Sequence, residues 1–344
     1  MQIAPGSRGG NLPRGSIEPA VALATRRLPR VTRHLPLATM FFVLALLTLA
    51  SVAKADKAAD HLTRGNALAA QGNWPAAVTE YRQALRSRPG FAEAHYNLAN
   101  ALNAEHDRTG AIAEYRQALQ LKPGFVAAHN NLALALRASG DLAGAAAELR
   151  EAVRLQPDYP EAHFNLADVL AGTGDVSGAI AEYRLALVIN PADARAAAGL
   201  GSALAKAGDP EHAVLELRQA VKLNPDDAPT HLKLANALAD TGDFDAAIAE
   251  YRLALLLRPD DAAARNDLGL AFEENGDLTR AIVEYRAAIR SQPGDAAAHH
   301  NLGRALEMAG DLRGAAQQYQ SASGLDPGNS RYKNDAARLA SAKQ

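Results

Sequence analysis

Asparagine recurs in this sequence at sites separated by 34 residues or by multiples of 34. One series comprises Asn97, Asn131, Asn165 and Asn301, and a second comprises Asn66, Asn100 and Asn236. A side-chain amide carries an acceptor oxygen and two N–H donors, which complement the N–H and C=O of a peptide bond. A row of such amides predicts a surface that holds an extended peptide by its backbone. The alternative interpretation is that these amides are solvated, or bond to one another between neighbouring repeats.

Two aromatic residues, Tyr96 and Phe164, directly precede asparagines of the first series. Aromatic side chains are frequent anchors in binding surfaces because they bury a large apolar area. We therefore add both residues to the predicted peptide-binding set. Packing between helices is the alternative role for each ring.

Histidine follows the same spacing and raises the question of a metal site. The series comprises His61, His95, His129, His163, His231 and His299. One histidine per repeat places neighbouring rings about one helix diameter apart, roughly 10 Å. Zinc needs its ligand nitrogens about 2 Å from a single ion. We therefore interpret these histidines as packed or hydrogen-bonded structural residues, and we predict no metal and no cofactor.

No arrangement of residues typical of catalysis occurs in the sequence. The chain contains no cysteine, no H-E-x-x-H, no phosphate-binding loop and no G-x-S-x-G. Gly199 and Gly201 fall inside an expected helix without a preceding strand, so they form no phosphate site. We predict that the protein is not an enzyme and has no catalytic residues.

Charge is distributed unevenly along the chain. Seven of the 36 Lys and Arg residues and one of the 38 acidic residues lie in the first 55 positions, so residues 56–344 carry 29 basic and 37 acidic side chains. Nucleic-acid binding requires a basic face that displaces counterions from phosphates. The acidic excess argues against a nucleic-acid partner.

The spacing reflects a 34-residue repeat, marked by proline at every 34th position from Pro89 to Pro327. Counting the third residue after each proline as position 1 gives eight units, at 58–91, 92–125, 126–159, 160–193, 194–227, 228–261, 262–295 and 296–329. Positions 20 and 27 are alanine in all eight units, position 8 is always Gly or Ala, and position 24 is always Tyr or Leu. Residues this small at fixed positions predict sites where neighbouring helices nearly touch.

Each unit predicts two helices. Glycine at position 15 accepts the left-handed conformation that ends a helix, as at Gly140. The aspartate that follows, such as Asp141, caps the second helix, and the proline at position 32 terminates it. His106 replaces the glycine in the second unit, where we expect a looser turn.

The combination of Leu at position 7, a small residue at 8, Ala at 20, Tyr at 24, Ala at 27 and Pro at 32 resembles the tetratricopeptide repeat. The resemblance implies an all-α, right-handed superhelical solenoid whose first helices line a concave groove. The asparagines are similar to those lining the groove in the repeat arm of O-GlcNAc transferase. The cations with which some family members clamp a terminal carboxylate are missing, since Leu62, Tyr96, Ala127 and Glu161 occupy those positions.

The resemblance implies an interaction scaffold that binds an extended peptide or a partner protein in this groove. The alternative function is a non-catalytic subunit of a glycosyltransferase or of an envelope polysaccharide export complex, which presents substrates or assembles the machine.

Both ends of the sequence differ from the repeats. A basic stretch, the uncharged run from Leu37 to Ala50 and the triplet Ala53-Lys54-Ala55 predict that residues 1–55 are a signal peptide cleaved near Ala55. The alternative is an uncleaved signal anchor, and this segment would then be the only contact with the membrane. The repeats are expected to be periplasmic or secreted, or else anchored to the inner membrane but outside the cytoplasm. Residues 330–344 are expected to form a C-terminal capping helix.

Overall fold

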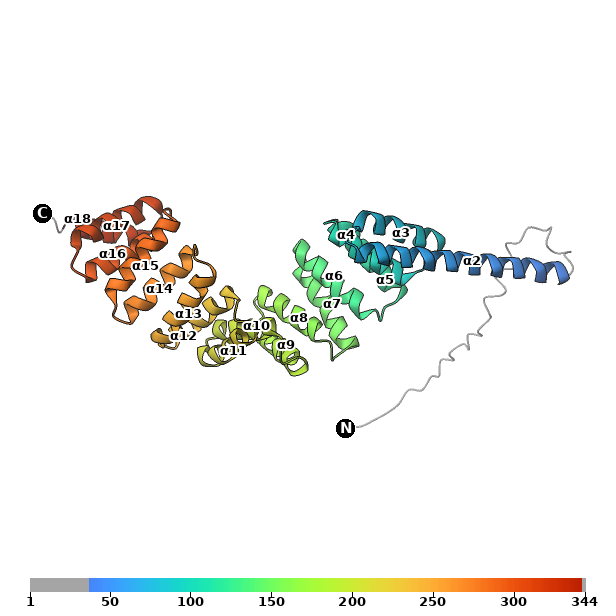
Figure 1. The fold of residues 1–344 in the computed structure, drawn as a ribbon, viewed down its shortest axis with the longest axis horizontal. Coiled ribbons are helices and arrows are strands. Elements are labelled where there is room, and N and C mark those ends of the chain that lie inside the picture. The colour runs from blue at the N-terminus through green and yellow to red at the C-terminus, as the bar shows by residue number, and fades with distance from the viewer. Residues whose placement is uncertain (1–36, 342–344) are drawn as a thin grey trace, which may run out of the picture.

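A computed structural model describes residues 37–341, which consist of helices joined by short turns (Figure 1). The first helices of the eight units are the last part of α2 (Leu37–Ala70), then α4 (Ala92–Ala104), α6 (Val126–Ser139), α8 (Pro160–Thr173), α10 (Ala194–Lys206), α12 (Ala228–Asp240), α14 (Ala262–Glu274) and α16 (Ala296–Met308). The second helices are α3 (Trp74–Ser87), α5 (Arg108–Leu121), α7 (Leu142–Leu155), α9 (Val176–Ile189), α11 (Pro210–Leu223), α13 (Phe244–Leu257), α15 (Leu278–Ser291) and α17 (Leu312–Leu325). A last helix, α18 (Ser330–Ser341), follows. The expected all-α solenoid is confirmed.

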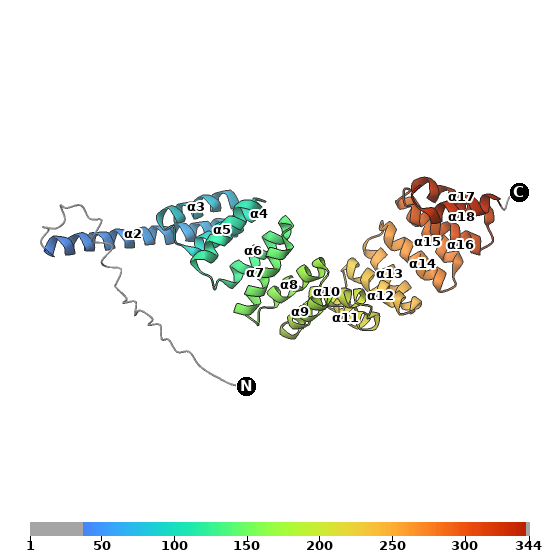
Figure 2. The ribbon, with the colours of Figure 1, turned by 180° about the vertical axis from the view of Figure 1, so that it is seen from behind.

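The helices stack in chain order into an elongated, curved array whose two ends lie far apart (Figures 1 and 2). Each helix packs on the helix before and after it. Consecutive first helices, such as α8 and α10, also contact each other, whereas consecutive second helices of the described residues make few contacts or none. The first helices therefore line the inner surface of the curve.

The core is a continuous thin layer of alanine, leucine and tyrosine. The alanines at positions 20 and 27 are at most 1% exposed throughout, from Ala77 to Ala322. A Cβ atom on Gly65 would lie only 2.5 Å from the Tyr81 ring. The expectation that position 8 marks a close approach of two helices is confirmed.

The turn inside each repeat has one geometry. Gly140 takes a φ of 92° at the end of α6, and Asp141 accepts a hydrogen bond from the Gly144 N–H at 2.8 Å. His106 takes a φ of 65°, and the Asp107 N–H donates to the Leu102 carbonyl at 2.9 Å. The corresponding bond from Asp141 to Leu136 is also 2.9 Å. The expected looser turn at His106 is wrong, because the histidine adopts the left-handed conformation that glycine takes elsewhere.

The N-terminal helix α2 runs without a break from Leu37 into the first repeat, so Ala55 lies within it. Its described side chains between residues 42 and 51 are exposed, since this part of the helix projects beyond the stack (Figure 1). Among the described residues, no helix has the combined length and apolar character needed to cross a membrane. The predicted basic part of the leader, before residue 37, lies outside the described residues.

At the other end, α18 packs on α17 and occupies the place of a ninth first helix. Leu339 is buried, and the Tyr332 ring lies 4.7 Å from the ring of His300. Residues 342–344 of the expected capping segment lie outside the described residues.

Candidate functional site

The inner surface contains three cavities, of about 590, 390 and 340 Å³. Their linings are drawn largely from positions 5, 6, 9, 12 and 13 of the first helices. Asn66, Asn97 and Asn100 line the smallest cavity, Asn236 lines the second and Phe164 lines the largest. Five of the nine residues predicted to bind a peptide therefore lie along these cavities.

The asparagines of the first four repeats bond to one another across repeat boundaries. The Asn97 Nδ2 donates to the Asn66 Oδ1 at 2.8 Å, and the Asn131 Nδ2 donates to the Asn100 Oδ1 at 3.1 Å. The buried Asn165 donates in the same way to Asn130 at 2.8 Å. We call Asn66, Asn97, Asn100, Asn130, Asn131 and Asn165 the amide network.

A similar bond joins repeats 7 and 8, where the Asn301 Nδ2 donates to the Asn266 Oδ1 at 2.9 Å. Bonding between neighbouring repeats was the alternative interpretation of these amides, and the structure shows that they do bond in this way.

Tyrosine hydroxyls complete the amide network. Tyr81 donates to the Asn66 Oδ1 at 2.9 Å, and Tyr115 donates to the Asn100 Oδ1 at 2.5 Å. Burial raises the pKa of both phenols, so they remain donors. Each of these amide oxygens thus accepts two hydrogen bonds, whereas the Nδ2 atoms of Asn66 and Asn100 have no partner within residues 37–341. The network leaves N–H donors beside the 340 Å³ cavity.

The two predicted aromatic anchors differ in their surroundings. Tyr96 packs 4.7 Å from the Phe125 ring, and its hydroxyl accepts a hydrogen bond from the Asn131 Nδ2 at 3.0 Å. Phe164 lines the 590 Å³ cavity and lies under the Arg195 guanidinium, 4.7 Å from its centre. Tyr96 is thus part of the packing between repeats, whereas Phe164 borders open space.

The 590 Å³ cavity, which we call the central cavity, lies where repeat 5 interrupts the amide network. Ala198, Gly199 and Ser202 occupy positions 5, 6 and 9 of α10. The Ser202 hydroxyl donates to the Ala198 carbonyl of its own helix at 2.6 Å. A Cβ atom on Gly199 would lie 2.5 Å from the Tyr183 ring, which approaches α10 closely. The small side chains of repeat 5 leave the space that their counterparts fill elsewhere.

Cations line the central cavity, although the repeats as a whole are acidic. Lys206 on α10 and Lys233 on α12 are exposed, and neither has an ion-pair partner among the described residues. The lining carboxylates are already bonded. Asp168 accepts from Arg137 at 3.0 Å and from Tyr183 at 2.6 Å. Asp227 accepts from the Thr230 hydroxyl and N–H at 2.5 and 3.0 Å.

These lysines were not predicted from the sequence. The signal for them was the break in the repeat pattern at positions 6 and 13 of repeats 5 and 6.

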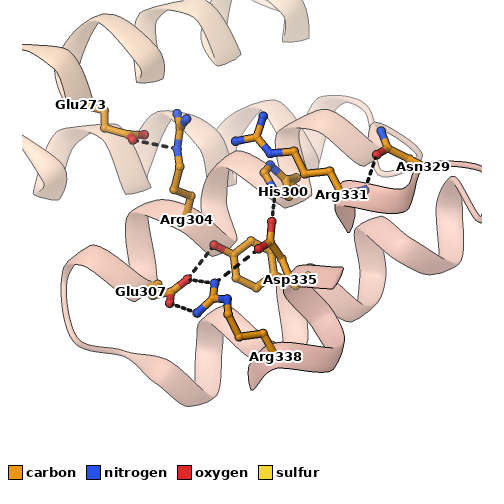
Figure 3. Close-up of polar contacts among 9 residues, drawn as sticks. Glu273, His300, Arg304, Glu307, Asn329, Arg331, Asp335 and Arg338 are labelled. Carbon is orange, nitrogen blue, oxygen red and sulfur yellow. Dashed lines mark hydrogen bonds and ion pairs between the residues drawn. The ribbon is translucent and has the colours of Figure 1, made fainter. Parts of the chain in front are cut away.

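The C-terminal repeats carry ion pairs on the inner surface in addition to the Asn301–Asn266 bond (Figure 3). Arg304 lies 2.9 Å from Glu273, and Arg338 lies 2.5 Å from Glu307, which also accepts from the Tyr319 hydroxyl. On α18, Asp335 bonds the His300 ring at 2.9 Å. The Arg304 pair joins repeat 7 to repeat 8, and the Arg338 pair joins repeat 8 to α18, whereas the amide network joins repeats 1 to 4.

The recurring histidines have one role in common. The His129 Nδ1 lies 2.6 Å from Glu148 at position 23 of the same repeat, and its Nε2 lies 2.8 Å from the Pro123 carbonyl. His95, His163 and His231 make equivalent pairs of contacts. The position-23 glutamates of these repeats thus bond the histidines of their own hairpins. Within the described residues, no three potential metal ligands lie together.

Comparisons with known proteins agree with this architecture. Family models described as tetratricopeptide repeat or TPR repeat match residues 65–104, 92–125, 130–194, 194–237, 232–285 and 273–339. No curated protein sequence matches the chain.

Several solved structures share the fold. YrrB, described as a TPR protein with an unusual peptide-binding site, is 22% identical with a TM-score of 0.50, and the alignment covers 54% of this chain and 96% of YrrB. A tetratricopeptide-repeat protein from Parabacteroides merdae is 16% identical with a TM-score of 0.53, covering 72% and 98%. The Cut9–Hcn1 structure is 15% identical with a TM-score of 0.53, covering 81% of this chain and 55% of the other. These likenesses show the fold.

Proposed function

Because this chain belongs to the tetratricopeptide-repeat family, we propose that it binds an extended peptide segment of a partner protein along the inner surface of its solenoid. The repeat array is a protein–protein interaction scaffold. The finer assignment, to a peptide in this groove, is carried by one observation: each of these three cavities is lined by residues of adjacent first helices.

Hydrogen-bond donors support a ligand held by its backbone. The Nδ2 atoms of Asn66 and Asn100 border one cavity, and Asn236 borders another, its oxygen already bonded to the Tyr251 hydroxyl at 2.5 Å. Such N–H groups complement the carbonyls of an extended chain. YrrB, which has a similar fold, is described as having a peptide-binding site. We expect binding without turnover.

We also propose that the repeats act outside the cytoplasm after removal of the leader near Ala55. The uncharged run before Lys54 and the exposed apolar side chains of α2, such as Phe42 and Leu49, support this. Mass spectrometry of the native protein should then give Asp56 as the first residue. An intact N-terminus would favour the anchored alternative.

The absence of cysteine allows a direct test of where the partner binds. A single cysteine would be placed at Ser202, in the central cavity, or at Lys222, exposed on the second helix of the same repeat. Each full-length variant would be labelled with a benzophenone maleimide and irradiated in an envelope extract. We expect a partner protein to be crosslinked to the Ser202→Cys variant. The same protein should not be crosslinked to the Lys222→Cys variant. Crosslinking from Lys222→Cys alone would place the interface on the outer face and contradict the proposal.

A further inference from the structure

We propose that the central cavity is the anion-recognising part of the groove, where Lys206 and Lys233 bind the carboxylate of an Asp or Glu side chain in the partner peptide. This inference rests on the proposed function, since it names the chemistry of the ligand at one place in the same groove. It also gives the groove a sequence preference, which backbone-binding amides alone do not supply.

The two lysines face one cavity from adjacent first helices. Lys206 ends α10 at position 13, and Lys233 lies at position 6 of α12. The asparagines at position 6 bond to position 5 or 9 of the preceding repeat, as in Asn97 and Asn131. The corresponding partners of Lys233 are Ala198, which has no polar side-chain atom, and Ser202, which bonds its own helix. The ammonium of Lys233 is therefore available to a ligand.

Carboxylates of the protein offset only part of the positive charge of this site. Asp168 is held by Arg137 and Tyr183, and Asp227 is held by Thr230. Arg195, the third cation in the lining, is paired with Asp193 at 2.9 Å. The two unpaired ammonium groups outnumber Asp227, the one lining carboxylate without a cationic partner, so the site is net positive. A ligand carboxylate there would accept charge-assisted hydrogen bonds, which are stronger than neutral ones.

The lining also suits the apolar part of such a side chain. Phe164, Ala171, Ala198 and Ala203 contribute apolar surface to the same cavity. The methylene groups of Asp or Glu would contact this surface while the carboxylate reaches the ammonium groups. A cavity of about 590 Å³ readily holds a single side chain and its backbone.

The neighbouring cavity limits where a second acidic residue can lie in the bound peptide. Asp240, Asp267 and Glu274 line the 390 Å³ cavity of repeats 6 and 7. These carboxylates would repel a second acid lying one repeat further along. One repeat corresponds to roughly 10 Å, or about three residues of extended chain. The groove therefore selects one acid at repeats 5 and 6 and disfavours another about three residues away.

The test uses a random dodecapeptide library, acetylated and amidated at its ends, panned against the full chain. We expect recovered peptides to be enriched in Asp or Glu at one position. The Lys206→Gln/Lys233→Gln variant should lose this enrichment and bind the best acidic peptide at least about threefold more weakly, with a smaller salt dependence. The Lys222→Gln variant, which removes a lysine of the same repeat from the outer face, should behave like the parent.

Each contrary outcome has a distinct meaning. Recovery of no peptide would contradict both the proposed function and this inference. Recovery without acid enrichment, or enrichment that persists in the double glutamine variant, would overturn the inference alone. A second library with free carboxyl termini tests whether the bound anion is the terminal carboxylate of a peptide rather than an Asp or Glu side chain. Lysine-dependent binding of that library only would assign the site to a terminal carboxylate and refute the side-chain proposal.

Discussion

Repeats 1–4 and repeat 5 share the same two-helix architecture and the same alanine core, but they differ in how adjacent first helices are joined. In repeats 2–4, the position-6 asparagine bonds to the preceding repeat, and a histidine ties each hairpin together. In repeat 5 the histidine is replaced by Ala197, and the position-6 residue is Gly199, which has no side chain to bond the preceding repeat. Repeat 5 thus stacks on repeat 4 without an amide bond at this position. Polar bonds on the inner surface decide whether that surface is closed or available to a ligand.

The largest effect should come from breaking the amide network at one of its two buried members. Asn165→Leu removes the bond to Asn130 and leaves a buried amide oxygen without its donor. We expect a loss of about 1–3 kcal/mol in the free energy of unfolding. Lys233→Leu changes the same repeat position where no bond exists, and we expect a change within about 0.5 kcal/mol.

Urea denaturation followed by far-UV circular dichroism would compare the two variants with the parent chain. Hydrogen exchange would show whether the loss in Asn165→Leu is centred on α6 and α8, since coupling in repeat proteins is mainly between nearest neighbours. Equal losses in the two variants would mean that the amide bonds contribute nothing beyond side-chain packing.

A smaller gain should come from extending the network. Asp267 lies at position 6 of repeat 7 and borders the same cavity as Asn236. In Asp267→Asn, the new Nδ2 could donate to the Asn236 Oδ1, as Asn97 does to Asn66. Burial raises the pKa of Asp267, because its charged form is poorly solvated. We expect a stabilisation of about 1 kcal/mol at neutral pH.

The gain in Asp267→Asn should depend on pH. An aspartate whose pKa is raised in the folded state favours folding fully only below its unfolded pKa, about 3.9. The parent loses this contribution as pH rises through the raised value, whereas the asparagine does not titrate. The difference between the two proteins should therefore shrink below about pH 4. Thermal unfolding midpoints at pH 4 and pH 7 would show this, and a constant difference would exclude the desolvation of Asp267 as its cause.

The fold could be predicted from the sequence because one 34-residue pattern carries it. The Gly-Asp turn, the alanines and the proline act within a hairpin or at its direct contact, so their meaning is local. The inner-surface positions also follow from helical periodicity. The partners of those residues could not be predicted, because they depend on which side chain the next repeat presents 31 or 35 residues away. Asn165 looked like a ligand-binding amide, yet in the structure it bonds Asn130.

The central cavity was missed for a related reason. Ala198, Gly199 and Ser202 look unremarkable as helix residues, and only their juxtaposition with Phe164, Lys206 and Lys233 creates a site. Similarly, the link between His129 and Glu148 requires the hairpin to close before the two residues meet. In this protein, the positions that depart from the repeat pattern were more informative about the site than the positions that follow it.

The smallest expected effect concerns pH and the histidines that repeat 5 lacks. Both ring nitrogens of His95 face acceptors, Glu114 at 2.5 Å and the Pro89 carbonyl at 3.0 Å, so both must carry protons to donate. The bond to Glu114 raises the pKa of His95. Burial on its own would lower the pKa of His129, but its bonds to Glu148 and to the Pro123 carbonyl outweigh this and raise it.

A raised folded-state pKa means that these two histidines stabilise the fold fully below the unfolded value, about 6.5, and less as pH rises through the folded value. We expect the thermal midpoint of the parent to fall between pH 6 and pH 8.5 by an amount equivalent to less than about 1 kcal/mol per histidine. His95→Ala/His129→Ala should be less stable than the parent at pH 6 and should approach it at pH 8.5. If the double variant kept the full pH dependence, the protonated bonds that distinguish repeats 2 and 3 from repeat 5 would not be its source.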